Sequence, residues 1–364
     1  MKARELFSAL IALPREAGTP ATTAARGLLI GHLTGLGYDV RELRFDFQPS
    51  TLNAFPLLGA GLGWLTLLEI PLLLIGNLPG LLAPLVWCSG AIALGLLAWG
   101  IGTGIEVPGA ERREDANIVA TRGAEPVRRW IIAHVDTKAQ GHSMAGRLAA
   151  VWVIILAGLL MTALTLWRVA GGAPIPSAPV AAAAGLSLAA GALAGRGRLR
   201  GTSLGARDNG TGLLAALLAA EGTREEGVGF LFTGAEEFGM VGMRAFLRDE
   251  GSLGAAEVLN LDTITDRGAL YLVAHDDRGR TLAEELLPAF RGAAPRVVVR
   301  RLPIGIMTDS LPVARAGSRA VTIARLDWSD LQRLHTSRDT TEELGLETAE
   351  AVGRVIAALE LQRR

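Results

Sequence analysis

Two long apolar stretches constrain this chain more than any other feature of its sequence. The first contains the runs Ala54 to Ile75 and Leu81 to Ile101, and the second contains Leu148 to Trp167 and Pro179 to Ala194. A helix of about 20 apolar residues spans the roughly 30 Å hydrocarbon core of a bilayer. A short turn containing Gly and Pro separates the two runs of each stretch, so we expect two transmembrane helical hairpins, at residues 54–101 and 148–194.

The composition agrees with a protein that lies partly in a membrane. Of the 364 residues, 50% are hydrophobic and 20% are charged, whereas about a quarter of the residues in a soluble domain are charged. Five of the seven Trp residues fall within the two apolar stretches. Buried helices of a soluble protein are a weaker alternative, because such helices seldom run for about 20 residues without a polar face. We therefore expect the lipid bilayer to be a partner of the chain.

Charge and cysteine content exclude several classes of function. Lys and Arg total 36, as do Asp and Glu, so the chain as a whole has no excess of positive charge with which to bind nucleic acid. The one cysteine, Cys88, lies in an apolar run and can form neither an internal disulfide nor a cysteine-based zinc site. Any metal ion must therefore be held by His, Asp and Glu.

The distribution of basic residues predicts the side of the membrane. Each hairpin returns the chain to the side from which it entered, so everything outside the hairpins shares one compartment. Only Arg168 lies in the short loops opposite, so the positive-inside rule predicts a cytoplasmic domain attached to the inner or plasma membrane. Glu5 and Arg15 near the N-terminus also argue against a secretory signal. The basic residues near the membrane on the predicted cytoplasmic side are Arg44, Arg112, Arg113, Lys138, Arg147, Arg196, Arg198 and Arg200.

One ionisable residue, Glu69, lies inside the first apolar run. An ionisable side chain at membrane depth is a candidate for a functional role. Two interpretations stay open: a protonated Glu69 bonded to a neighbouring helix, or a direct part in the function of the protein.

Residues 1–53, 102–147 and 195–364 alternate between strand and helix patterns, and we expect them to form one discontinuous domain. Such alternation favours an α/β fold, a doubly wound mixed β-sheet with helices on both faces, whose ligands bind beyond the carboxyl ends of the strands. Helices are expected at 2–13, 20–36, 212–221, 240–248, 281–290 and 348–361. Strands are expected at 38–47, 117–121, 130–133, 228–233, 258–262, 269–273, 297–301 and 320–324.

Residues that can carry chemistry lie where these elements end. Two histidines and several carboxylates at one sheet edge favour zinc, since imidazole and carboxylate together suit that ion. Five ligands are too many for one tetrahedral ion, but they suit two ions about 3.5 to 4 Å apart if one carboxylate bridges them. The segments are His134-Val135-Asp136, Asp208-Asn209-Gly210, Glu236-Glu237, Asn260-Leu261-Asp262 and His335-Thr336.

In this order, His-x-Asp, Asp-Asn-Gly-x-Gly, Glu-Glu, Asn-x-Asp and a late His-Thr resemble the co-catalytic di-zinc aminopeptidase family, which also contains glutaminyl cyclases and transferrin-receptor-like modules. The similarity covers nearly all the chain outside the hairpins, beginning at Leu13-Pro14-Arg15-Glu16-Ala17-Gly18-Thr19. The resemblance implies a zinc-exopeptidase-like fold and a site with two Zn²⁺ ions. It implies His134 and Asp262 on one zinc, Glu237 and His335 on the other, and Asp208 between them.

The resemblance also implies roles in hydrolysis of a peptide substrate. Glu236 is then the general base, which takes a proton from water and returns it to the leaving amine, while zinc polarises the carbonyl. Asp136 is then the carboxylate that orients the imidazole of His134.

Other residues are given secondary or structural roles. His32, His142 and His275 fill no place in the metal site, so we interpret them as structural or surface residues. Thr308-Asp309-Ser310 resembles a segment that lines the family's pocket, although Asp309 could equally cap the following helix. One departure concerns the turn after the metal-binding Asp, which is rich in Gly in the family and is Asp262-Thr263-Ile264-Thr265 here.

The predicted function is an integral-membrane zinc aminopeptidase that removes N-terminal residues from peptides. The first alternative is a glutaminyl cyclase-like acyltransferase, which uses a similar scaffold with one zinc. The second is a non-catalytic membrane scaffold of the same fold, which the complete ligand set disfavours.

Overall fold

The computed structural model describes residues 2–75, 81–103, 106–171, 175–251, 253–302 and 306–359. The chain forms two compact units: one contains Met1–Pro49, Glu111–Ala139 and Gly201–Arg364, and the other contains Ser50–Ala110 and Gln140–Arg200. The predicted turn at Asn77-Leu78-Pro79-Gly80 lies outside the described residues, as do residues 172–174 of the second predicted turn. Each unit is described separately below.

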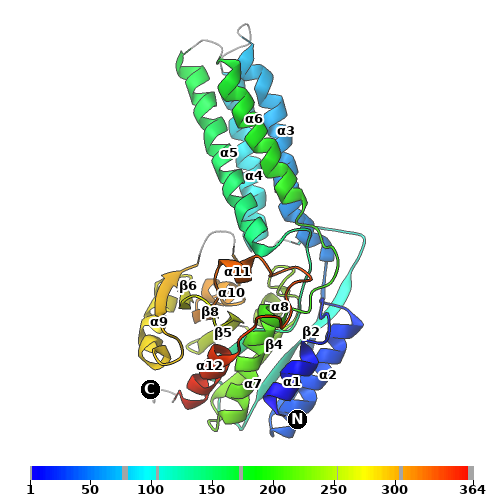
Figure 1. Ribbon diagram of the computed structural model, residues 1–364, viewed down its shortest axis with the longest axis vertical. Helices are drawn as coiled ribbons and strands as arrows, with labels where there is room; N and C mark the ends of the chain where they lie inside the picture. Colours follow the sequence, from blue (N-terminus) through cyan, green and yellow to red (C-terminus); the bar gives the residue numbers. More distant parts are fainter. Residues whose placement is uncertain are drawn as a thin grey trace. The chain divides into compact units, whose positions relative to one another are not determined.

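The first unit is built on one mixed sheet of eight strands, in the order β1-β2-β4-β3-β5-β8-β6-β7 (Figure 1). The four central strands β4, β3, β5 and β8 run parallel, as do β6 and β7, whereas β1 with β2, β2 with β4, and β6 with β8 pair antiparallel. The bounds are β1 Asp39–Phe47, β2 Arg113–Thr121, β3 Arg129–His134, β4 Val228–Thr233, β5 Glu257–Ile264, β6 Leu270–Ala274, β7 Val297–Arg301 and β8 Arg319–Arg325.

Helices cover both faces of this sheet. Alternate strand residues point to opposite faces, so Ile131 packs in one hydrophobic cluster with α1, α2, α7, α9 and α12, whereas Ile132 packs in another with α8 and α10. Strands buried on both faces explain the near-continuous apolar runs in the sequence. The bounds are α1 Ala3–Leu10, α2 Pro20–Gly35, α7 Gly212–Gly222, α8 Val241–Glu250, α9 Asp277–Phe290, α10 Ser310–Arg315, α11 Trp328–Leu331 and α12 Glu347–Ala358.

The mixed α/β fold agrees with the sequence prediction, but several element ends differ, such as that of β2, which begins at Arg113 and not at residue 117, and the short helices α10 and α11 lie outside the predicted helix ranges. The helix predicted from residue 281 begins at Asp277, because the Asp276 side chain accepts the backbone N–H of Gly279 at 2.8 Å and caps it. The first helix ends at Leu10 and not at residue 13. Leu13 precedes Pro14, and a residue before proline disfavours helical backbone.

The second unit contains four long helices that run side by side (Figure 1). Each is long and apolar enough to cross a membrane. The helices are α3 Ala54–Leu74, α4 Leu82–Thr103, α5 Met144–Gly171 and α6 Ser177–Gly195, and a short 3-10 turn, Pro49–Asn53, precedes α3. The fourth, although short and rich in Ala, packs closely on α3: a Cβ added to Gly59 would lie 2.5 Å from the Cβ of Ala194. Small residues of this kind let helix backbones approach one another.

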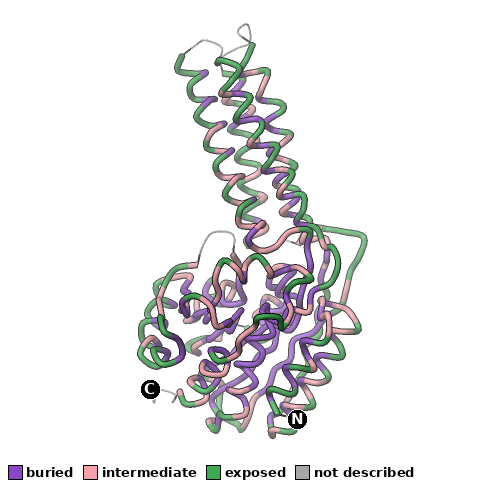
Figure 2. Tube along the Cα trace, in the orientation of Figure 1, coloured by how far each residue is buried: buried purple, intermediate pink, exposed green. Residues whose placement is uncertain are grey.

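The outer surface of these four helices is apolar. Of the residues that the structure describes, twenty large hydrophobic side chains are exposed, and nineteen of them belong to this unit. Between 11% and 39% of the most apolar window of each helix is buried, and exposed residues run along the whole bundle (Figure 2). Most of the apolar surface of these helices is therefore not buried by the residues that the structure describes.

Glu69 faces the inside of the bundle. Its side chain is fully buried, and its Oε1 accepts a hydrogen bond of 3.1 Å from Thr165 Oγ1 on α5. This contact links α3 to α5, and it favours the interpretation in which Glu69 bonds to a neighbouring helix.

Candidate metal centre

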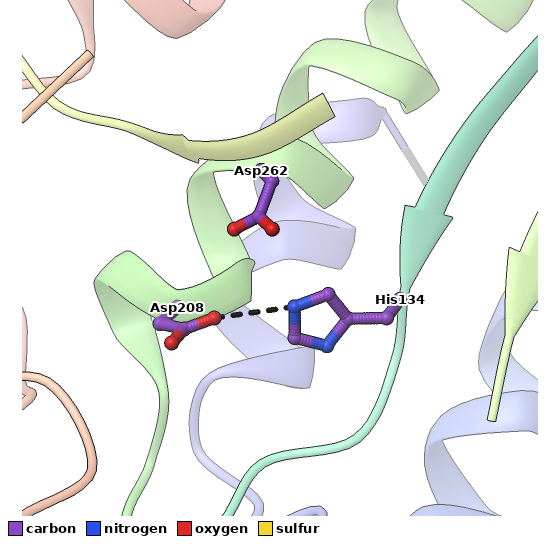
Figure 3. A group of neighbouring side chains, drawn as sticks. All are labelled: His134, Asp208 and Asp262. Atoms are coloured by element: carbon purple, nitrogen blue, oxygen red, sulfur yellow. Dashed lines mark ion pairs between the residues drawn. The ribbon is translucent and has the colours of Figure 1, made fainter. Parts of the chain in front are cut away.

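Two overlapping groups of ligand-type side chains lie at the carboxyl ends of the central strands. His134, Asp208 and Asp262 form the first group, which Figure 3 shows, and Asp208, Glu237 and His335 form the second. In each group the ligand atoms lie within 4.8 Å of one another. The structure thus brings together all five residues that the sequence predicts as ligands. Imidazole nitrogens and carboxylate oxygens at this spacing fit zinc.

Asp208 lies between the two histidines. Its Oδ1 is 3.2 Å from His134 Nε2, and its Oδ2 is 3.2 Å from His335 Nε2. One carboxylate oxygen thus faces each group, as a bridging ligand requires. The peptide bond after Asp208 is cis, and the helical turn Ala206–Thr211 that carries it leads directly into α7.

The first group is tied together by Asn209. Its side-chain amide donates to the carbonyl of Leu261 at 2.8 Å, and its Oδ1 accepts the backbone N–H of Thr263 at 3.1 Å. These two residues flank Asp262 on β5, so one side chain holds the Asp208 loop against the end of that strand. The sequence motif contained Asn209, but only the structure assigns it this positioning role.

The second group contains a basic residue that the sequence analysis placed elsewhere. Glu237 Oε2 lies 3.3 Å from His335 Nε2 and 2.6 Å from Lys138 Nζ. Lys138 is buried, so it is a component of the site and not the juxtamembrane surface charge that the sequence analysis counted. The other carboxylate oxygen, Glu237 Oε1, is buried and has no hydrogen-bond partner among the described residues.

Asp136 has a wider role than the sequence predicted. His134 Nδ1 lies 3.0 Å from the backbone carbonyl oxygen of Asp136, whereas the nearest Asp136 carboxylate oxygen is 3.7 Å away, too far for a hydrogen bond. The carboxylate instead accepts the backbone N–H groups of Glu236 at 3.0 Å and Glu237 at 3.1 Å. The orienting contact to the imidazole therefore comes from the backbone, and the carboxylate positions the Glu-Glu pair.

Arg15 is a positioning residue to which the sequence patterns assigned no role in the site. Its fully buried guanidinium donates to five backbone carbonyls, those of Leu10 and Val135 at 2.8 Å, Leu204 at 2.9 Å, Gly205 at 3.1 Å and Leu13 at 3.4 Å. Val135 lies between His134 and Asp136. Leu204 and Gly205 directly precede the turn that carries Asp208. Burial lowers the pKa of Arg15 to about 10, which still leaves it charged at neutral pH.

The crowding of buried carboxylates changes their acidities. Burial raises the pKa of Glu236 well above its ordinary value, and the neighbouring carboxylates add to this effect although His134 opposes it. Burial also raises the pKa of Asp262 to about 6. For Asp208, burial is outweighed by the two histidine contacts, which hold its pKa far below the ordinary range. A carboxylate whose pKa is raised accepts a proton more readily, as a general base requires.

Asp309 does not cap the helix that follows it, because its side chain makes no bond to the first turn of α10. It is buried and accepts a hydrogen bond of 2.5 Å from Thr233 Oγ1 at the end of β4. His32, His142 and His275 belong to neither metal group. His275, for example, lies 2.7 Å from Ser310 Oγ.

One family model matches the C-terminal part of the chain. Residues 187–360 match the family described as Peptidase family M28. The matched range contains Asp208, Glu236, Glu237, Asp262 and His335, whereas His134 precedes it. The comparison with curated proteins gave no match.

Solved structures share the fold at low sequence identity. A glutaminyl cyclase from Fimbriiglobus ruber superposes with a TM-score of 0.56 at 15% identity, over 98% of this chain and 92% of its own. A leucine aminopeptidase precursor from Bacteroides thetaiotaomicron gives a TM-score of 0.55 at 14% identity, over 98% and 94%. A zinc aminopeptidase from Bacillus subtilis gives 0.55 at 13% identity, over 98% and 94%.

The family match covers the C-terminal half of the chain, and the fold supplies His134 from the preceding part. The matched residues and the buried donor set together identify the chain as a zinc-dependent metallopeptidase.

Proposed function

We propose that this metallopeptidase is an integral-membrane aminopeptidase that removes N-terminal residues from peptides at a site with two zinc ions. The observation that carries the proposal is the position of Asp208, whose two oxygens each lie 3.2 Å from the Nε2 atom of a different histidine. A carboxylate held in this way could be shared by two ions, which His134 and Asp262 would hold on one side and Glu237 and His335 on the other.

The residues of the chain divide the reaction between them. Zinc bound there supplies a Lewis acid for the peptide carbonyl and acidifies a water molecule. Glu236 accepts a proton from the attacking water at its carboxylate and returns it to the leaving amine nitrogen as the C–N bond breaks. The two backbone contacts from Asp136 keep Glu236 and Glu237 in place during these transfers. The side chains that would contact the zinc are buried or nearly so, which strengthens their electrostatic interactions.

A glutaminyl cyclase-like activity is the second candidate, because glutaminyl cyclases are among the proteins that share the fold. Such an enzyme would form a lactam from an N-terminal Gln and release ammonia. The presence of a full second ligand group favours hydrolysis. The same complete set also argues against a non-catalytic scaffold.

A panel of peptides separates these activities. The full chain, purified in detergent with zinc, would be incubated with peptides that begin with Leu, Arg or Gln, and with acetylated counterparts. We expect loss of the first residue from the free peptides only, and no loss with Glu236→Gln. Loss of 17 Da, the mass of ammonia, from the Gln peptide alone would establish the cyclase and overturn the aminopeptidase; unchanged masses across the panel would also contradict it.

We also propose that the second unit lies in a bilayer as two helical hairpins. Four apolar helices and nineteen exposed large hydrophobic side chains support this placement. A water-soluble bundle would present a polar surface. The protein should therefore stay with the membrane pellet after alkaline carbonate extraction, and release into the supernatant would contradict the proposal.

The cytoplasmic side is proposed from the basic residues of the sequence, without Lys138, which is buried. A Cys88→Ser background with Glu226→Cys tests it, since Cys88 is the one native cysteine and Glu226 is exposed in the turn before β4. A membrane-impermeant maleimide should label this cysteine only after the cells are permeabilised. Labelling of intact cells would place the catalytic unit outside.

A further inference from the structure

Lys138 lies against one metal ligand at hydrogen-bond distance. Its Nζ is 2.6 Å from Glu237 Oε2 and donates to the backbone carbonyl of Glu237 at 3.3 Å. The Lys138 side chain is 3% exposed, and the Glu237 side chain is 4% exposed. Because the ammonium group makes two contacts with Glu237 and is almost inaccessible to solvent, it is fixed beside this carboxylate.

This contact makes the two metal groups different. The oxygen that Lys138 contacts is the one that faces His335 at 3.3 Å, in the group Asp208, Glu237 and His335. In the other group, neither His134 nor Asp262 forms an ion pair with Lys or Arg in the part of the chain that the structure describes. A lysine ammonium therefore contacts a ligand-type carboxylate of the second group directly, whereas the cation nearest the first group, Arg15, donates to backbone carbonyls and to none of the three ligand-type side chains.

A buried ammonium at this position opposes a divalent cation in two ways. It occupies a lone pair of the carboxylate oxygen that faces His335, and it would repel a metal ion bound beside it through a medium of low dielectric. When no metal is bound, the same ammonium pairs with Glu237, so the carboxylate is not left as an isolated buried charge. Lys138 thus stabilises the zinc-free form of this half of the site and lowers its affinity for zinc.

We propose that Lys138 makes the two zinc positions unequal, so that zinc on His134, Asp208 and Asp262 is retained while zinc on Asp208, Glu237 and His335 is weakly held and exchanges. This inference rests on the proposed two-zinc function. It assigns Lys138 as a positioning residue that acts through Glu237.

Zinc content measured by mass spectrometry tests the inequality. The full chain in detergent would be loaded with zinc and dialysed against a chelator buffer of graded strength. We expect an intermediate range in which the wild type keeps one zinc and Lys138→Met keeps two. The substitution should raise the affinity of the weaker position on the order of 10- to 100-fold, the scale seen for residues that contact metal ligands. Lys138→Arg keeps the charge and should behave as the wild type.

Two histidine variants identify which zinc remains. Within the same chelator range, His335→Ala should keep one zinc, as the wild type does, and His134→Ala should keep none. The reverse pattern would overturn the proposal, as would equal zinc release by the wild type and Lys138→Met. Failure of the wild type and of Lys138→Met to bind two zinc ions even without chelator would instead overturn the two-zinc function itself, so the two failures are distinguishable.

Thermal unfolding provides a readout that does not depend on zinc counting. Without zinc, Lys138→Met should unfold at a lower temperature than the wild type, because Glu237 loses its partner. Excess zinc should raise the melting temperature more in Lys138→Met than in the wild type, since binding energy adds to stability. An equal rise in both proteins would contradict the assigned role.

Discussion

The Oδ1 atom of Asp136 lies 3.0 Å from the backbone nitrogen of Glu236 and accepts its N–H. The other carboxylate oxygen accepts the next N–H along the chain, that of Glu237. These contacts join the loop after β3 to the loop after β4, which are neighbouring parallel strands. One side chain therefore sets the position of both the proposed base and a metal ligand.

Asp136→Ala should lower stability and zinc content together. It leaves two buried N–H groups without an acceptor, and each such group costs about 1 to 3 kcal/mol. Asp136→Asn retains one acceptor oxygen and should show a smaller loss. Denaturant unfolding and zinc analysis would measure both effects. If Asp136→Ala has the stability of the wild type, the acceptor role is wrong.

Glu236→Gln should remove hydrolysis and leave zinc binding intact. The amide has nearly the same shape but cannot accept the proton of the attacking water, so we expect kcat to fall on the order of 10²- to 10⁴-fold. Peptide turnover and zinc content should be measured on the same sample. Loss of zinc together with activity would assign Glu236 to the ligand set instead.

Arg15→Met should destabilise the peptidase unit. The substitution leaves several buried carbonyls without donors, which costs about 1 to 3 kcal/mol each. Arg4→Met is a matched control, because the Arg4 side chain is 68% exposed. The free energy of unfolding should fall by several kcal/mol for the first variant and change little for the second. Similar losses in the two proteins would contradict the structural role of Arg15.

Zinc affinity should increase with pH. Burial disfavours the charged form of His134 and of His335, but contacts with neighbouring carboxylates raise the pKa of both above the ordinary value. Zinc needs neutral imidazole, so binding must displace these protons. Competition with a chelator of known pH dependence, at pH 6, 7 and 8, would measure the slope. A constant affinity would show that no proton is released.

In the metal-free protein the same two histidines should make the folding stability decrease as the pH rises, whereas zinc affinity increases over the same range. A histidine whose folded pKa is raised stabilises the fold fully below its unfolded pKa of about 6.5, and this contribution is lost as the pH rises through the folded pKa. Melting temperatures should therefore fall with rising pH without zinc. With zinc present they should rise over the same range, as binding becomes tighter.

Glu69→Gln distinguishes the two interpretations of this residue. The amide keeps an oxygen that can accept from Thr165, so an interhelix contact predicts unchanged peptide hydrolysis and nearly unchanged thermal stability in detergent. Thr165→Val removes the donor and should cost about 0.6 kcal/mol, the average for such contacts in membranes. Loss of hydrolysis by Glu69→Gln would instead give Glu69 a part in the reaction.

Local periodicity was enough to predict much of the architecture. Buried strands such as Val228–Thr233 and long apolar helices such as Ala54–Leu74 have patterns set by the burial of their own side chains. The positions of polar residues at strand ends also predicted that these side chains meet at one edge of the sheet, because carboxyl ends of parallel strands share one edge.

Only the tertiary structure decided what the remaining buried polar groups contact. Lys138 and Glu237 are 99 residues apart, and the sequence offered no reason to pair them or to bury Lys138. Asp136 and Arg15 likewise find backbone partners in loops that the strand order brings together. The sequence by itself therefore determined most of the helices and strands, because these follow from short-range hydrophobic pattern, while the family resemblance pointed to the five ligand-type residues that meet. The partners of the buried charges depended on which loops the sheet places side by side, because an ion pair or hydrogen bond is decided by distance in space.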